Sequence, residues 1–227
     1  MKISEIFYSI QGEGMLAGVP SVFVRTSGCN LRCSWCDTPY TSWEPEGVAM
    51  RVAEIVAEAG RHPARHVVVT GGEPMIQPEI GELTGRLRDA GLHITIETAG
   101  TMLVPVACDL MSISPKLANS TPREREGGRW APVHERLRYQ PDVLAQLMAS
   151  YPYQLKFVIA ASEDLAEVEN LLDEIRADRS RVVLMPEGID PGALAERGRW
   201  LAEICKERSY RFSPRLHVML WGNRRGV

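Results

Sequence analysis

The sequence has no apolar run approaching the roughly 18 residues that a membrane-spanning helix needs. It also has no excess of positive charge, because 26 lysines and arginines stand against 29 aspartates and glutamates. Near the start of the chain, Glu5 interrupts the segment in which a secretory signal would carry its apolar core. These absences predict a cytoplasmic protein that has no membrane partner and no direct nucleic-acid partner.

Cysteine is scarce, with five in 227 residues, yet three of them fall within eight consecutive positions. Cys29, Cys33 and Cys36 lie in the segment TSGCNLRCSWCDTPYT. In the reducing cytoplasm, clustered cysteines hold metal or do redox work more often than they form disulfides. The other two, Cys108 in an expected strand and Cys205 in an expected helix, have the apolar neighbours of core residues.

Short β-rich runs alternate along the chain with longer segments of helical period. Runs bounded by turn residues predict strands at 21–27, 66–70, 92–98, 108–114, 153–159 and 181–187. Apolar residues spaced by three and four predict helices at 49–59, 79–90, 142–150, 163–177 and 192–208. This alternation is typical of a parallel sheet covered by helices.

The length and the 44% hydrophobic content suit one domain, residues 1–227, and no internal repeat is present. We predict an α/β fold, an open partial (β/α) barrel of about six mainly parallel strands with outer helices, because the usual barrel closes with eight. A doubly wound sheet is the alternative that periodicity does not exclude. Residues 117–140 show no clean period and are expected to form a functional or mobile loop.

The clustered cysteines follow the first predicted central strand, so they are expected at the edge where the parallel strands end. A C-x3-C-x2-C triplet supplies three ligands to a four-iron, four-sulfur cluster and leaves one iron open to another ligand. A structural zinc site takes four ligands, so zinc would need His62, His66 or His93 to complete it. The spacing favours the 4Fe-4S cluster.

A second segment supports a ligand-binding edge. In VVVTGGEP, residues 67–74, a β-run breaks into two glycines that let backbone N–H groups approach a ligand, and Glu73 adds a carboxylate. Such a turn suits an amino acid head group. The segments IETAG at 96–100, SPK at 114–116 and YQLKF at 153–157 also place polar residues at strand ends.

The cysteine spacing and the Gly-Gly-Glu-Pro order resemble the radical S-adenosylmethionine superfamily. The segments FYSIQGEG at 7–14, FVRTSGCNLRCSWCDTPYT at 23–41, SPKLANSTP at 114–122 and PRLHVMLWGNRRGV at 214–227 are further similar to the 7-carboxy-7-deazaguanine synthase family of deazapurine and queuosine biosynthesis. Asp37 follows the third cysteine, where glycyl-radical activating enzymes commonly carry histidine. The alternatives are such a glycyl-radical activase and a non-catalytic, zinc-stabilised binding module.

The resemblance implies a lyase that contracts the ring of 6-carboxy-5,6,7,8-tetrahydropterin to 7-carboxy-7-deazaguanine with loss of ammonia. A 5′-deoxyadenosyl radical removes hydrogen from C6 of the pterin, and S-adenosylmethionine is regenerated, so it acts as a cofactor. The chemistry belongs to the cluster and this radical, and no side chain is assigned as catalytic. The resemblance also implies Mg²⁺ on Thr38, an electron donor such as flavodoxin or ferredoxin, and a homodimer.

Residue chemistry and the resemblance together assign the remaining site residues. Arg25, at a strand end, has the planar fork that binds a carboxylate, and Gln11 and Glu13 offer donors and acceptors to a pterin edge. The substrate is expected to contact Ile10, Gln11, Gly12, Glu13, Arg25, Thr70 and His217. S-adenosylmethionine is expected to contact Trp35, Asp37, Gly72, Glu73, Thr98, Ser114, Pro115, Lys116, Gln154 and Lys156.

A strand is also predicted near the end of the sequence. Leu216, Val218 and Leu220 alternate with His217, Met219 and Trp221. This alternation has the period of a half-buried strand. This strand is expected to dock and to turn His217 toward the substrate. Residues 222–227 are expected to cover the cavity.

Overall fold

One sheet of nine strands, in the order β3-β1-β2-β4-β5-β6-β7-β8-β9, organises the protein in a computed structural model that describes residues 1–227. Its six central strands run parallel, and their order in space follows their order in the chain without the reversal of a doubly wound sheet. The sheet does not close, so the predicted open partial barrel is confirmed. The central strands are β2 (Pro20–Thr26), β4 (His66–Gly71), β5 (His93–Thr98), β6 (Leu110–Ile113), β7 (Tyr153–Ile159) and β8 (Val182–Pro186).

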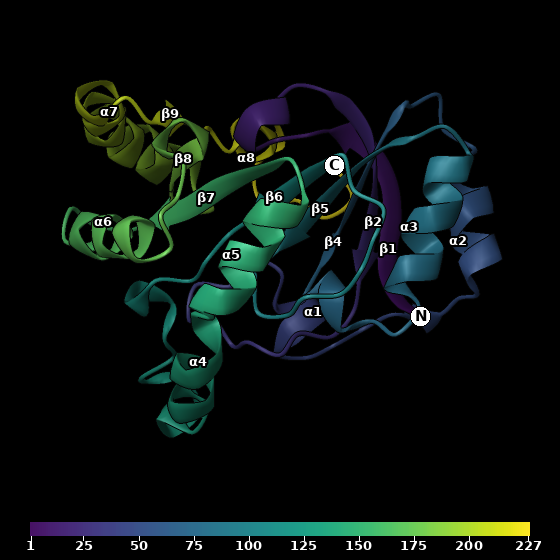
Figure 1. Cartoon of the computed structure of the whole chain (residues 1–227), viewed down its shortest axis with the longest axis horizontal. Coiled ribbons are helices and arrows are strands. Elements are labelled where there is room, and N and C mark those ends of the chain that lie inside the picture. The colour runs from purple at the N-terminus through teal and green to yellow at the C-terminus, as the bar shows by residue number, and fades with distance from the viewer.

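Five helices correspond to the five predicted ones and lie on the outside of the sheet (Figure 1). They are α2 (Val52–Ala59), α3 (Ile80–Asp89), α5 (Pro141–Ser150), α6 (Asp164–Glu174) and α7 (Pro191–Arg208). A short helix, α1 (Pro39–Ser42), follows the cysteine segment. None of the helices combines the length and the apolar character that crossing a membrane requires.

Several parts of the fold differ from the prediction or were not predicted. Strand β1 (Lys2–Ile10) pairs antiparallel with β2, and two-residue strands, β3 (Val48–Ala49) and β9 (Arg211–Phe212), form the sheet edges. Segment 117–140, which was expected to form a loop, contains a helix, α4 (Ala131–Arg138).

The predicted strand near the end of the chain is wrong, because Leu216–Trp221 form a helix, α8. A strand would place Leu216, Val218 and Leu220 on one buried face. Instead Val218 is buried whereas Leu220 is 55% exposed. The short alternating pattern was compatible with either structure.

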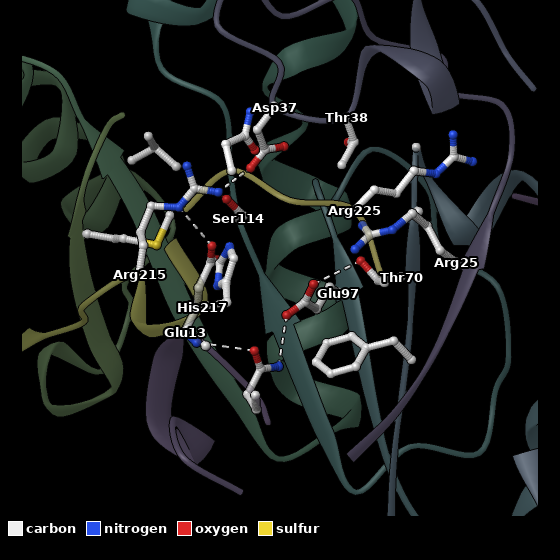
Figure 2. A pocket seen from close by; sticks show the side chains of 18 of the residues that line it. Glu13, Arg25, Asp37, Thr38, Thr70, Glu97, Ser114, Arg215, His217 and Arg225 are labelled. Atoms are coloured by element: carbon white, nitrogen blue, oxygen red, sulfur yellow. Dashed lines mark hydrogen bonds and ion pairs between the residues drawn. The ribbon is translucent and has the colours of Figure 1, made fainter. Parts of the chain in front are cut away.

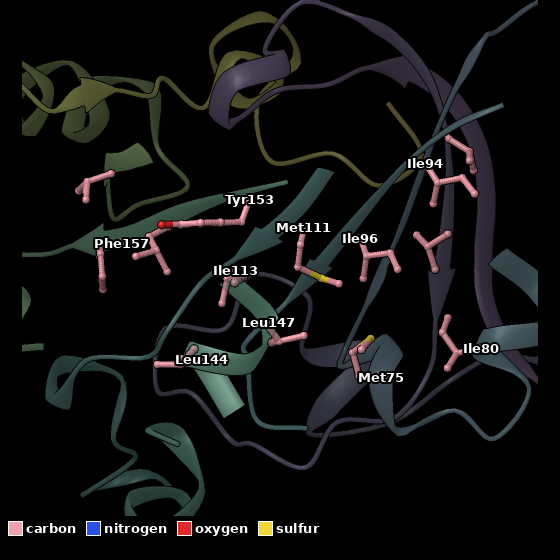
Figure 3. Packing of buried hydrophobic residues seen from close by; sticks show 14 of the residues in the cluster. Met75, Ile80, Ile94, Ile96, Met111, Ile113, Leu144, Leu147, Tyr153 and Phe157 are labelled. Carbon is pink, nitrogen blue, oxygen red and sulfur yellow. The ribbon is translucent and has the colours of Figure 1, made fainter. Parts of the chain in front are cut away.

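The core lies between the outer face of the sheet and the helices. Alternation along β4 and β5 sends Val67, Val69, Ile94 and Ile96 outward into one large apolar cluster. Figure 3 shows this cluster, with Met111 and Ile113 of β6 lying beside Leu144 and Leu147 of α5. The intervening strand positions face the interior of the partial barrel, and they carry the polar residues of the site.

Candidate active site

The interior of the partial barrel opens at the C-terminal ends of the parallel strands into a cavity of about 430 Å³. Inward positions fall in register between neighbouring strands, so Arg25 lies beside Thr70, and Glu97 lies beside Ser112. Figure 2 shows polar side chains from several strands pointing into this space. A cavity of this size and lining suits a small, polar, charged ligand.

The structure brings together all seven residues assigned to the substrate. The wall of the cavity includes Ile10, Gln11, Gly12, Glu13, Arg25, Thr70 and His217. Glycine is required at one of these positions, because a Cβ on Gly12 would lie 2.0 Å from Nδ1 of His217. The N–H of Leu216 also donates to the carbonyl of Gly12 at 2.9 Å. The first and last segments of the chain therefore meet at the cavity wall.

Seven of the ten residues assigned to S-adenosylmethionine line the same cavity: Trp35, Asp37, Gly72, Thr98, Ser114, Lys116 and Lys156. Within this group, Lys116 donates to the hydroxyl of Ser114 at 2.8 Å and lies over the ring of Trp35. The structure places the other three, Glu73, Pro115 and Gln154, behind the wall.

Glu73 and Gln154 have structural partners instead of an open face toward the cavity. The buried carboxylate of Glu73 accepts hydrogen bonds from the hydroxyl of Thr98 at 2.8 Å and from two backbone N–H groups. The amide of Gln154 accepts from the N–H of Met15 at 2.7 Å and donates to Ser112 at 2.7 Å. Both residues fix backbone that forms the wall, a role that the motif alone did not distinguish from direct contact.

The three clustered cysteines surround a second cavity of about 120 Å³ beside the first. Nowhere in the chain do three His, Cys, Asp or Glu side chains converge as a single metal ion would require. Three free thiols around a shared space suit a cluster of several atoms instead. Burial raises the pKa of Cys33 to about 12, so bound iron must offset the desolvation of the thiolate. These residues fit a 4Fe-4S cluster.

The two cavities share part of their walls. Residues that line both are Trp35, Asp37, Thr38, Gly71, Gly72, Ala99 and Lys116. Gly72 allows the turn after β4 to pack closely against the cysteine loop, because a Cβ there would lie 2.2 Å from the carbonyl oxygen of Gly28. A ligand seated at this shared wall would reach both the thiols and the larger cavity.

Arg215 is the main charged residue of the site that the sequence did not reveal. Its side chain is 6% exposed, and its guanidinium forms an ion pair with Asp37, donates to Glu13 at 3.1 Å and donates to the carbonyl of Gly188 at 2.6 Å. Figure 2 shows Arg215 between the two carboxylates. The arginine thus joins the C-terminal segment to the cysteine loop and to the segment after β1.

These ion pairs decide the charge state of the site. Burial opposes ionisation of Glu13, but Lys156, Arg215 and His217 outweigh it and hold the pKa of Glu13 well below its usual value. At Asp37 burial would raise the pKa, but the nearby guanidinium of Arg215 outweighs it, so the pKa of Asp37 is lowered. Both carboxylates are therefore ionised at neutral pH.

Glu97, on β5, belongs to the IETAG segment, but only Thr98 of that segment was assigned to the site. Its two carboxylate oxygens accept from the amide of Gln11 at 3.1 Å and from the hydroxyl of Thr70 at 2.8 Å. A charged residue inside a β-rich run was the available signal, since an inward carboxylate needs partners. Glu97 joins two of the predicted substrate residues.

Arg25 lies where it can still act as a carboxylate fork. Its Nε donates to Glu5 at 2.7 Å, and its guanidinium lies over the ring of Phe7. Nε is the only nitrogen of its guanidinium with a hydrogen-bond partner in the chain, so the terminal nitrogens are free for a ligand in the cavity. Glu5 orients the fork without neutralising its binding edge.

Of residues 222–227, which were expected to cover the cavity, residues 223–227 line it, and they follow α8 in place of the predicted strand. Arg225 fixes this segment in place. Its side chain pairs with Glu46 at 2.9 Å and with Glu5 at 3.3 Å, and it lies 4.0 Å from the ring centroid of Tyr40. The C-terminal segment is therefore bonded to elements at the opposite end of the sequence.

His134 of α4 anchors the cysteine loop from outside the cavity. Its Nδ1 accepts from the backbone N–H of Arg32 at 3.1 Å, and its Nε2 lies 2.9 Å from the hydroxyl of Ser120. Because that hydroxyl donates to Leu117, it accepts from Nε2–H, which fixes the tautomer of the ring. Segment 117–140 therefore positions the loop that carries the thiols.

We expect His134→Ala to loosen this loop. One buried and one partly buried hydrogen bond would be lost, a cost of about 1–3 kcal/mol for groups left unsatisfied, so Tm should fall by about 2–10 °C. The reconstituted variant should also lose iron to a chelator faster than the wild type. His62→Ala is the control, because His62 only stacks on Tyr8. Identical Tm and iron loss in His134→Ala and wild type would contradict this role.

His134 should also make the stability of the protein depend on pH. Burial lowers the pKa of His134 to about 4, whereas an unfolded histidine titrates near about 6.5. The unfolded chain binds the extra proton between these values, so the stabilisation is complete above pH 6.5 and is lost as the pH falls toward 4. Across this range Tm should decrease more in the wild type than in His134→Gln.

Comparison with known proteins agrees with this geometry. The profile of the Radical SAM superfamily matches residues 23–129. The 7-carboxy-7-deazaguanine synthase of Halobacterium salinarum is 47% identical over 98% of this chain and 91% of its own length, and that of Rhodopirellula baltica is 43% identical over 99% and 88%. The crystal structure of QueE from Escherichia coli superposes with a TM-score of 0.73 at 28% identity, covering 95% of this chain and 94% of that one.

Proposed function

This chain belongs to the 7-carboxy-7-deazaguanine synthase family, and from that premise we propose that the two adjoining cavities form its active site. The enzyme is a radical S-adenosylmethionine lyase that converts 6-carboxy-5,6,7,8-tetrahydropterin to 7-carboxy-7-deazaguanine with loss of ammonia. The observation that carries the assignment of the site is the shared wall, because S-adenosylmethionine must touch an iron of the cluster and the substrate at once.

When bound, the 4Fe-4S cluster and S-adenosylmethionine supply the 5′-deoxyadenosyl radical. The protein provides position, charge and exclusion of water. Cys29, Cys33 and Cys36 hold the cluster, and the wall formed by Trp35, Asp37, Gly72, Thr98, Ser114, Lys116 and Lys156 surrounds S-adenosylmethionine.

The pterin occupies the larger cavity in this proposal. Arg25 binds its carboxylate through the free edge of the guanidinium. Gln11, Glu13 and Glu97 offer amide and carboxylate oxygens to the N–H groups of the heterocycle. The neutral ring of His217, whose pKa is lowered by burial, completes the wall.

The decisive assay is anaerobic. Reconstituted, chemically reduced enzyme with S-adenosylmethionine and carboxytetrahydropterin should release the deazapurine and ammonia while the amount of S-adenosylmethionine stays constant. If the enzyme only cleaved S-adenosylmethionine to 5′-deoxyadenosine and left the pterin intact, the assigned reaction would be refuted for this chain.

We also propose that Mg²⁺ binds between Thr38 and the substrate. The support is that Thr38 lines both cavities, at the point where a bound pterin carboxylate would approach the cluster loop. Magnesium is often held by few protein oxygens together with substrate oxygens and waters, so one hydroxyl is an adequate protein ligand.

Thr38→Ala is expected to raise the Mg²⁺ concentration for half-maximal activity by about tenfold, roughly the effect of one lost ligand bond of about 1.4 kcal/mol. Thr41→Ala should change it less, because the hydroxyl of Thr41 donates to the carbonyl of Thr38 and does not line either cavity. Metal titrations of both variants measure the difference. Full activity of the wild type in excess chelator would count against a magnesium site.

Deletion of residues 223–227 should raise KM for the pterin and increase uncoupled cleavage of S-adenosylmethionine. These residues cover the cavity mouth, and water would reach the radical once they are removed. Arg225→Ala should produce a smaller change in the same direction, since it releases the pairs with Glu5 and Glu46. Wild-type coupling in both variants would show that the segment is not a cover.

We further propose that the protein forms a homodimer, takes its electron from flavodoxin or ferredoxin and works in the cytoplasm. The exposed apolar side chains of Met219, Leu220 and Trp221 on α8 support self-association, because apolar residues gathered on one surface favour burial against a partner.

A further inference from the structure

The outer side of the cysteine loop carries two stacks of arginine on tryptophan. The guanidinium of Arg125 lies 3.8 Å from the ring centroid of Trp43, and those of Arg32 and Arg129 lie 4.8 and 5.4 Å from that of Trp130. None of these five residues lines either cavity. We call this surface, made by Arg32, Trp43, Arg125, Arg129 and Trp130, the arginine–tryptophan face.

This face is positively charged in a chain whose net charge is −3. Residues 121–140 contain five arginines, three glutamates and no other charged residue except His134, which is neutral. Of the face's arginines, Arg129 pairs with Glu126, whereas Arg32 and Arg125 have no carboxylate partner. Stacking on indole holds a guanidinium in place while it keeps its charge.

The face also touches the cluster site directly. The indole N–H of Trp43 donates to the carbonyl of Cys33 at 3.0 Å, and the backbone of Arg32 precedes that cysteine. Trp43 itself is partly exposed. One hydrogen bond therefore separates a cluster ligand from a side chain at the protein surface. Figure 1 shows α4, the helix that follows Trp130, projecting from the body of the protein below α5.

We propose that the arginine–tryptophan face docks a small, acidic electron-carrier protein. The carrier is oxidised by one electron and the 4Fe-4S cluster is reduced by one, so no other reactant is needed. This inference rests on the proposed function, because a 4Fe-4S cluster that cleaves S-adenosylmethionine must first be reduced by one electron, and must be reduced again after each uncoupled cleavage. Complementary charge would steer the carrier to the side of the loop that is opposite the substrate.

The test compares two reductants in the same variants. Arg125→Glu/Arg129→Glu reverses the charge of the face, and Arg65→Glu/Arg211→Glu makes the same charge change at two exposed positions outside it. Each holoenzyme is assayed anaerobically with dithionite, and separately with reduced acidic flavodoxin over a range of concentrations. Iron content and Tm show whether a variant is misfolded. If the charge reversal disrupts folding, Arg125→Gln/Arg129→Gln removes the two charges with a smaller change.

We expect Arg125→Glu/Arg129→Glu to need at least about tenfold more flavodoxin for half-maximal rate, with dithionite-driven turnover within about twofold of wild type. The wild-type rate with flavodoxin should fall as salt is added, and the variant should lose this dependence. Unchanged flavodoxin dependence, an equal effect in the control variant, or an equal loss with dithionite would each overturn the docking proposal. Absence of product from wild type with dithionite would refute the proposed function instead.

Discussion

Cys33→Ala is expected to abolish turnover and most of the cluster. Two remaining thiolates cannot hold a 4Fe-4S cluster that three protein ligands share. Substituting a residue that only supports a metal ligand lowers metal affinity or activity by about 10–100-fold. Loss of a ligand itself should therefore lower activity by more than about a thousandfold. Iron content and the visible absorption of the reconstituted protein measure the cluster independently of activity.

Cys205→Ala is the matched control, because Cys205 is also buried but lies on the inner face of α7, in the apolar core. It should keep its iron and its activity. The same comparison separates the cluster from the zinc alternative, since a zinc protein would be colourless and would carry no stoichiometric iron. A fully active, iron-loaded Cys33→Ala enzyme is the result that would overturn the assignment.

Arg215→Gln is expected to lower kcat/KM by about 10²-fold or more. Removing one partner of a buried ion pair costs about 3–5 kcal/mol, and here two carboxylates, Glu13 and Asp37, lose the same cation. Arg208→Gln provides the control, because Arg208 forms only an exposed pair with Glu169 on the outer helices. Arg215→Lys should recover part of the loss, since it restores the charge without the fork.

The pH profile distinguishes this role from simple destabilisation. In the wild type, Arg215 and Lys156 keep the pKa of Glu13 below its usual value, so activity should persist into acid. Without the arginine, the pKa values of Glu13 and Asp37 rise, and the acid limb should move to higher pH. An Arg215→Gln enzyme with the wild-type acid limb and only a lower Tm would refute the assignment to the site.

Local patterns predicted the parts of the fold that repeat. The six central strands are short, almost continuous apolar runs, and the five outer helices have apolar residues spaced by three and four, so their types follow from the sequence pattern. Strand β1 was missed because Glu5 breaks its apolar alternation, and the reason is now evident: Glu5 faces Arg25 across the β1–β2 pair. Helix α4 has a polar sequence, and His134 is its only buried residue.

Motifs predicted residues that gather at the site, but not which of them line the cavity. In the Gly-Gly-Glu-Pro segment, Gly72 lines the larger cavity, whereas the carboxylate of Glu73 accepts hydrogen bonds from backbone N–H groups. Arg215 and Glu97 were not predicted because their partners are distant in sequence. The ion pairs of Arg215 and the hydrogen bonds of Glu97 form only when distant segments fold together, which no local window of the sequence contains.

The bonds of Arg215 join residues that are synthesised far apart in time. Glu13 and Asp37 precede it by 202 and 178 positions. At about 5–20 residues per second, a ribosome makes Arg215 some 10–40 s after those two residues. Throughout that interval the larger cavity is without the part of its wall that Arg215, His217 and residues 223–227 later provide. The substrate cavity is therefore completed only when the last segment of the chain has folded, after the cysteine loop and the central strands have been made.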